Sequence, residues 1–140
     1  ADCVWERFSH DILLRSIKDL LSRSKDARIY MVAGLHTGRS TLVHFFRHAL
    51  AIGLCLVPVP PADVWPTCPQ ETTALPGSEH IMELEVGGTW DEHETPYLTG
   101  QRRPFLLHRG SPDQEDEPIQ VRNHWLTVSC MAWAATEATP

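Results

Sequence analysis

The stretch that most constrains the fold of this chain lies between Ile29 and Gly53. An apolar run, Ile29–Val32, is followed by a turn that contains Gly34 and Gly38, and then by an amphipathic segment that begins at Leu42. A short apolar run, a glycine turn and a segment of helical period together predict a β-strand that leads directly into an α-helix. Strand-to-helix units of this kind are the building blocks of α/β folds.

The turn between the predicted strand and helix has some features of a phosphate-binding loop. That loop requires four residues between its first glycine and the Gly-Lys pair, followed by Ser or Thr. Here only three residues separate Gly34 from Gly38, and Arg39 stands where the lysine belongs. A phosphate- or nucleotide-binding role is therefore the weakest hypothesis for this turn. We assign His36 to the structure of the turn and Arg39 to surface or capping contacts.

Periodicity elsewhere predicts an alternation of strands and helices up to Pro60. The opening residues 1–5 are expected to be the end of a strand, and Ser9 or Asp11 caps a helix that ends near Ser24. The further expected elements are a strand at 28–33 that is apolar on both faces, a helix capped by Thr37 or Ser40 that stops at Gly53, and a strand at 54–59. Such an alternation predicts parallel strands joined by right-handed crossovers.

The character of the chain changes after Pro60. Prolines recur between 61 and 79, which predicts a loop, and alternation at Met82, Leu84 and Val86 predicts one short, half-exposed strand. An acidic loop follows at 110–118, and residues 122–133 are expected to form a last strand covered on both sides. The long connection between the last two long strands indicates a hairpin whose tip is expanded by an insertion.

Composition excludes several classes of protein. The 140 residues carry a net charge of -6, which disfavours a nucleic-acid surface, and no apolar run is long enough for a membrane span. The four cysteines form no CxxC motif and no secretory signal is visible, so we expect free thiols in the cytosol or the nucleus.

His44 and His48 have helical spacing without an accompanying Glu or Cys, and we interpret them as surface residues rather than metal ligands. The absence of a starting Met and the strand-like opening indicate a piece of a longer protein.

Three sequence blocks together resemble one enzyme family. They are ADCVW at 1–5 with His10 and LLRS at 13–16, AGLHTGR at 33–39 with FF at 45–46 and GL at 53–54, and RNHWL at 122–126 with Trp133. In this order and spacing they resemble the C-terminal half of the lysine-methyltransferase-like group of class I S-adenosyl-L-methionine (SAM)-dependent methyltransferases. Within that group they are most similar to the fungal nicotinamide N-methyltransferase-like branch. The resemblance covers residues 1–60 and 119–133.

The resemblance implies an α/β fold with a partial Rossmann-like sheet. Of the seven strands in the methyltransferase sheet, only strands four to seven would be present, with an expanded hairpin between the last two. Residues 1–60 would belong to the methyltransferase core, 61–118 to a Pro-rich and acidic insertion with one short strand, 119–133 to the final strand and 134–140 to a tail. Helix D, strand five, helix E, strand six and strand seven would follow the strand-four end at 1–5.

The same resemblance implies an N-methyltransferase that uses SAM as its cofactor. The acceptor would be an amine of a small molecule such as nicotinamide, or of a protein lysine or N-terminus. Ala1 would touch SAM, Asp2 would be the catalytic residue that orients the amine, and Trp5 would line the acceptor pocket; no metal is expected. The glycine-rich turn and the acidic residue that hold SAM in this family would precede Ala1, so the chain alone is expected to be inactive.

The implied chemistry is physically reasonable, and simpler interpretations stay open. Methyl transfer needs an unprotonated amine held in line with the sulfonium, a carboxylate can hydrogen-bond that amine, and an aromatic face favours a methylammonium group. In the simpler interpretation, Asp2 caps a turn and Trp5 packs against the core without a role in binding. Arg122 and Trp125 are expected to anchor the last strand. The second hypothesis for the whole chain is a non-enzymatic α/β interaction module that binds a partner through its insertion.

Overall fold

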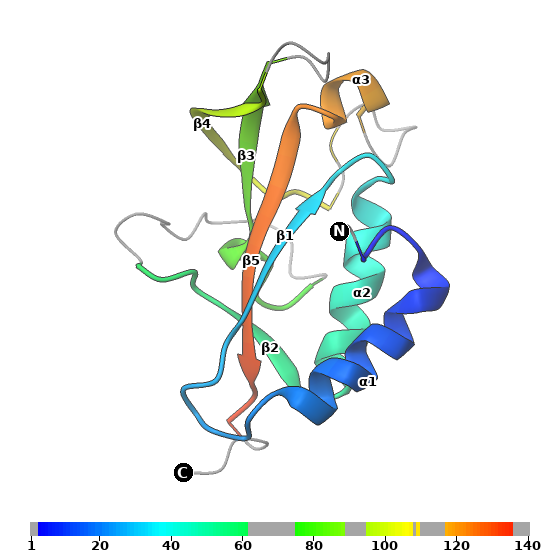
Figure 1. Cartoon of the computed structure of the whole chain (residues 1–140), viewed down its shortest axis with the longest axis vertical. Helices are drawn as coiled ribbons and strands as arrows, with labels where there is room; N and C mark the ends of the chain where they lie inside the picture. Colours follow the sequence, from blue (N-terminus) through cyan, green and yellow to red (C-terminus); the bar gives the residue numbers. More distant parts are fainter. Residues whose placement is uncertain (1–2, 62–74, 89–94, 108, 110–116, 136–140) are drawn as a thin grey trace.

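The computed structural model describes residues 3–61, 75–88, 95–107, 109 and 117–135. Within them the chain has a mixed α/β fold, as expected, with a five-stranded antiparallel open sheet (Figure 1). The principal elements are α1 (His10–Leu20), β1 (Ile29–Gly34), α2 (Arg39–Ala51), β2 (Leu54–Val57), β3 (Met82–Gly87), β4 (Tyr97–Pro104), α3 (Ile119–Arg122) and β5 (Trp125–Trp133). Short 3-10 turns at Arg7–Ser9 and Ser78–His80 precede α1 and β3.

Strand β5 is the centre of the sheet. It pairs antiparallel with β1 along one edge, and with both β2 and β3 along the other edge. Residues 54–57 of β2 lie opposite 130–133, whereas residues 82–85 of β3 lie opposite 125–128. Strands β2 and β3 therefore lie end to end beside β5 and point in the same direction.

Strands β1 and β2 point in the same direction, as the predicted alternation of strands and helices requires, but they do not pair with each other. Strand β5 lies between them, and every pairing among the described strands is antiparallel. Periodicity identifies a strand but carries no information about which later strand will pair with it. The expanded hairpin also differs from expectation, because the chain between β2 and β5 adds β3 to β5 and β4 to β3 instead of forming only a longer tip.

Two further expectations for the N-terminal half are wrong. Residues 3–5 form a bend instead of a strand end, because no described strand runs beside them to pair with their backbone groups. Strand β1 is not apolar and buried on both faces: the side chains of Tyr30 and Val32 are 61% and 64% exposed. The alternate residues Ile29, Met31 and Ala33 pack against the hydrophobic core.

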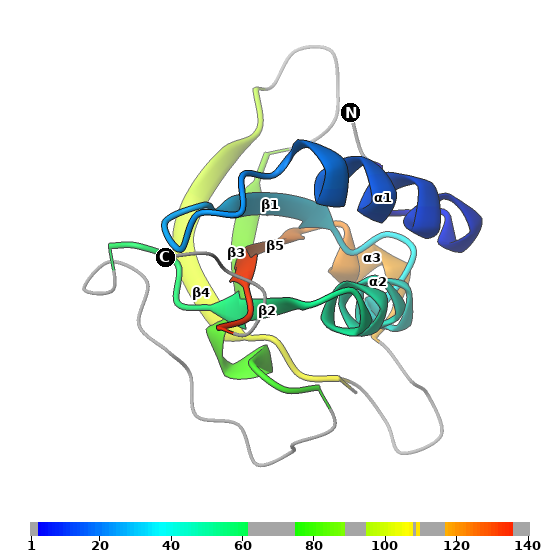
Figure 2. The same ribbon diagram turned by 90° about the horizontal axis from the view of Figure 1, so that it is seen from below.

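Helices α1 and α2 lie on the same side of the sheet and contact each other (Figures 1 and 2). Helix α1 ends at Leu20, before the predicted Ser24, and it exposes the apolar side chains of Ile12 and Leu20. Gly38 stands at the N-cap of α2, at φ 89°, where no side chain caps the helix. Gly53, at φ 93°, follows the end of α2 as predicted.

The hydrophobic core fills the space between these helices and the sheet. Its α2 side chains are Leu42, Val43, Phe45, Phe46 and Ala49, and they join Met131 and Trp133 from β5 in one buried cluster. The last strand begins at Trp125, because residues 119–122 form the short helix α3 where strand was expected to begin at Arg122. Across the described residues, none of the helices has both the length and the apolar character that a membrane span requires.

Candidate functional site

The structure describes one of the three residues predicted to form the methyltransferase site. Ala1 and Asp2 lie outside the described residues. Trp5 is described, and its side chain is half exposed, next to the buried Val4. The predicted contacts of these three residues with SAM and the acceptor amine stay predictions.

A groove of about 220 Å³ lies next to Cys3 and Val4, along the edge of β1 that β5 does not occupy. Its other lining residues are Leu13, Ile17, Ile29, Tyr30, Met31, Val32, Phe45 and Met131. A SAM site needs polar partners for the ribose and the amino-acid end of the cofactor, and this lining offers no carboxylate. The lining of this groove therefore does not by itself fit SAM.

Arg39, at the start of α2, is completely buried rather than on the surface. Its Nε donates a hydrogen bond to Oε1 of Glu83 at 2.7 Å, and its Nη2 donates to Oε2 of the same carboxylate at 2.9 Å. The predicted surface or capping role of Arg39 is therefore wrong. Its guanidinium also faces a carboxylate, so it does not stand in for the lysine of a phosphate-binding loop.

Arg39 and Glu83 belong to an arginine–glutamate cluster that also contains Arg103, Arg109 and Glu117. Arg103 donates from Nε to Glu83 Oε2 at 2.5 Å and also pairs with Glu117, while Arg39 Nη2 lies 2.9 Å from Glu117 Oε1. Burial opposes ionisation of Glu117, but the hydrogen bonds from Arg103 and Arg39 outweigh it and lower the pKa of this carboxyl. The cluster fastens the start of α2 to β3, β4 and the segment before α3.

Arg122 holds the turn after β1 through hydrogen bonds to its backbone. Its Nη1 donates to the backbone carbonyls of Leu35 at 2.9 Å and His36 at 3.0 Å, and its Nε donates to the carbonyl of Glu117. Trp125 stacks under the guanidinium of Arg103, 3.8 Å from the ring centroid. These contacts agree with the expected anchoring roles of Arg122 and Trp125.

Three histidines from α1 and α2 form a row. His10 Nε2 lies 2.8 Å from the carbonyl oxygen of Val4, and His10 Nδ1 lies 2.8 Å from His44 Nδ1. The His48 ring stacks on His44 with 4.1 Å between centroids, and its Nδ1 lies 2.9 Å from Asp11 Oδ1. Our interpretation of His44 and His48 as simple surface histidines is therefore incomplete, because the buried His10 connects this row to the core.

The hydrogen bonds constrain the protonation of this row. A carbonyl oxygen only accepts, so His10 Nε2 carries a proton and donates to Val4, and the contact between the two Nδ1 atoms of His10 and His44 holds one proton between them. Burial, followed by the nearby His48, His10 and Arg7, lowers the pKa of His44. The hydrogen bond from His48 lowers the pKa of Asp11. At neutral pH, His44 is therefore neutral and its Nε2 is free to accept a proton.

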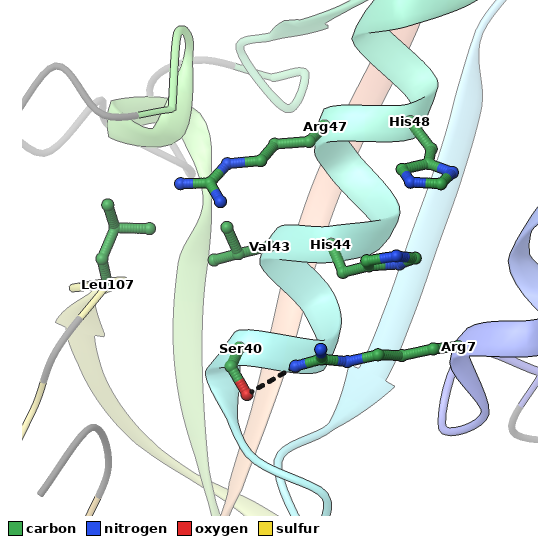
Figure 3. A pocket seen from close by; sticks show the side chains of 7 residues that line it. All are labelled: Arg7, Ser40, Val43, His44, Arg47, His48 and Leu107. Atoms are coloured by element: carbon green, nitrogen blue, oxygen red, sulfur yellow. Dashed lines mark hydrogen bonds between the residues drawn. The ribbon is translucent and has the colours of Figure 1, made fainter.

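A pocket of about 440 Å³ adjoins the row, and Figure 3 shows its side chains. The arginine–histidine pocket, as we call it, is lined by Arg7, Ser40, Val43, His44, Arg47, His48 and Leu107. Arg7 Nη2 donates to Ser40 Oγ at 3.2 Å. Sequence reasoning missed this pocket: the spacing of His44, Arg47 and His48 places them on one helical face, but nothing local indicates that Arg7 and Leu107 join them.

Comparisons of this chain with family models, with curated proteins and with solved structures found no match.

Proposed function

We propose that this chain forms the C-terminal part of a class I SAM-dependent methyltransferase, whose complete fold transfers a methyl group to an amine of a small molecule or of a protein. The observation that carries the proposal is the order α1, β1, α2, β2 and β5, in which β5 is antiparallel to β2. The family resemblance implies the same order, from helix D to an antiparallel strand seven. The three sequence blocks that carry the resemblance add support.

The open edge of β1 also supports the proposal. In the described part of the chain, β1 pairs with β5 on one side only, and the apolar groove lies along its other edge. The exposed Tyr30 and Val32 lie on the same strand. Unpaired backbone groups next to exposed apolar side chains are expected where a sheet continues into further strands.

The proposal assigns SAM binding to a part of the fold outside the described residues. By resemblance, the glycine-rich turn and the acidic residue that hold the cofactor precede Ala1. When bound, SAM supplies the methyl group. The proposed roles of this chain are to orient the acceptor amine through Asp2 and to line its pocket with Trp5. Isolated, the chain is expected to bind SAM poorly and to show no methyl transfer.

Isothermal calorimetry with SAM tests this function. One sample is this chain, and the other is a version extended upstream through a glycine-rich loop. Binding only by the extended version is the expected result, and methyl transfer from labelled SAM to an amine then completes the test. Absence of SAM binding by both versions contradicts the methyltransferase proposal, and robust turnover by this chain alone contradicts its assignment as an inactive part.

A non-enzymatic interaction module is the second candidate function, and one observation favours it. Phe8, Ile12 and Leu20 expose large apolar side chains along α1 and the turn before it. Contiguous exposed apolar side chains mark protein-interaction surfaces. If neither version binds SAM, resistance of residues 61–118 to proteolysis only when a partner is added would favour this candidate.

A further inference from the structure

We propose that the arginine–histidine pocket binds a phosphate group carried by a small molecule. Its lining brings together two guanidinium groups, two imidazoles and one hydroxyl, and it contains no carboxylate. The two guanidinium groups make this pocket positively charged in a chain with a net charge of -6. This inference is independent of the proposed methyltransferase function, because none of the lining residues belongs to the predicted SAM or acceptor site.

The two arginines approach the pocket from different elements. Figure 3 shows Arg7 reaching from the turn before α1 to Ser40, while Arg47 extends from α2 toward Leu107. In the described part of the chain, neither guanidinium is paired with a carboxylate. Arginine stays charged at all physiological pH values, and its planar set of donors matches the oxygens of a phosphate. The hydroxyl of Ser40 adds a further donor next to Arg7.

His44 gives the pocket a proton-dependent donor. Because its Nδ1 is engaged with Nδ1 of His10, Nε2 is the remaining ring nitrogen of His44, and a proton or an anion can be accommodated there while the contact with His10 stays in place. The charged and titratable groups that act on His44 are His48, His10 and Arg7, which favour its neutral form, and Asp11, which opposes them. A bound anion would offset the positive neighbours and favour protonation. Anion binding should therefore be accompanied by uptake of a proton.

The dimensions and the apolar part of the lining point to a small molecule as the carrier of the phosphate. A volume of about 440 Å³ lies within the usual range for small-molecule sites, which is about 300–1,000 Å³. Val43 and Leu107 contribute apolar side chains near Arg47, as Figure 3 shows, where they are available to contact the rest of the ligand. A site with polar groups at one end and apolar groups beside them suits a phosphorylated metabolite better than a free ion.

The test is titration of the full chain with inorganic phosphate, followed by calorimetry and by NMR of the histidine rings. We expect saturable binding at one site, and a rise in the pKa of His44 when phosphate is bound. Arg7→Gln and Arg47→Gln should each weaken binding by ~10- to 100-fold, the range for one hydrogen bond to a charged group. Arg102→Gln, which removes the same charge from the exposed surface of β4, should change the affinity by less than ~2-fold.

Three outcomes would overturn the proposal: no binding at millimolar phosphate, an equal loss of affinity in Arg102→Gln, or no shift of His44 on binding. Circular dichroism of each variant separates a lost contact from a lost fold, and Arg47→Lys, which keeps the charge, should retain part of the affinity. Sulfate serves as a second probe because its charge is constant over the pH range of histidine titration. Its affinity should rise as the pH falls through the pKa of His44, and a flat profile would contradict the proposed role of this histidine.

Discussion

Arg39 and Glu83 are both completely buried, and two parallel hydrogen bonds of 2.7 and 2.9 Å join the guanidinium to the carboxylate. One residue starts α2 and the other lies on β3, so the pair connects the helical layer to the sheet. Removing a charge from water costs several kcal/mol, and that cost is recovered only while the partner is present. The pair therefore makes the position of β3 depend on Arg39.

Glu83→Gln should strongly destabilise the protein. The substitution keeps the size of the side chain but leaves Arg39, Arg103 and Arg109 with Glu117 as the remaining carboxylate of the cluster. Breaking a buried ion pair from one side costs about 3–5 kcal/mol. Urea denaturation measures the change in unfolding free energy. Glu85→Gln on the same strand is the control, because the amide oxygen can still accept the hydrogen bond from Thr99, and its cost should stay below about 1 kcal/mol. Equal losses in the two variants would show that the buried cluster contributes nothing specific.

His10→Phe should destabilise the protein by about 1–3 kcal/mol, the cost of leaving a buried polar group without its partner. The new ring can still pack against Phe45, but the carbonyl of Val4 and the Nδ1 of His44 lose their hydrogen bonds. Thermal and urea denaturation measure the loss. His124→Phe is the control at an exposed histidine and should change stability by no more than about 0.5 kcal/mol. A wild-type stability for His10→Phe would mean that the histidine row has no structural importance.

Stability should fall as the solution is acidified, in two stages. His44 and Glu117 both have lower pKa values in the folded chain than their ordinary values of 6.5 and 4.5. In each case the unfolded chain takes up the proton first, so the unfolding free energy decreases with falling pH. The first decrease begins near pH 6.5 and the second below pH 4.5. Urea midpoints between pH 8 and 3.5 would show both stages, and His44→Gln should lack the first. If the unfolding free energy of this variant falls between pH 7 and 5 with the same slope as in the wild type, His44 is not the cause of the first decrease.

Gly77→Ala and Gly100→Ala together separate backbone strain from steric overlap. Both glycines have positive φ, at 83° and 88°, so either substitution should cost about 1–3 kcal/mol in strain. At Gly77 an added Cβ would also lie 2.7 Å from Cβ of Leu56, whereas at Gly100 it would meet no atom within 4 Å. Gly77→Ala should therefore lose a further ~1–3 kcal/mol in urea denaturation. Equal losses would mean that β2 shifts freely to accommodate the methyl group.

The local elements of the N-terminal half could be predicted because their signals are local. The apolar run of β1, the core face of α2 and the stop at Gly53 depend on residues that are near each other in the sequence. Boundaries were less accurate: α1 ends at Leu20, and α3 occupies residues that were assigned to the last strand. Propensity describes each segment alone, whereas tertiary contacts decide where a segment ends.

The sequence alone therefore determined the mixed α/β class, the positions of β1, α2 and β2, and the family resemblance. Only the tertiary structure decided that β5 lies between β1 and the line of β2 and β3, and that Arg39 meets Glu83 and Arg7 meets Ser40. The physical reason is that hydrophobic period and turn chemistry act over a few residues, whereas strand register and charge pairing are set when distant segments pack. The arginine–histidine pocket exists only because that packing brings the turn before α1 against α2.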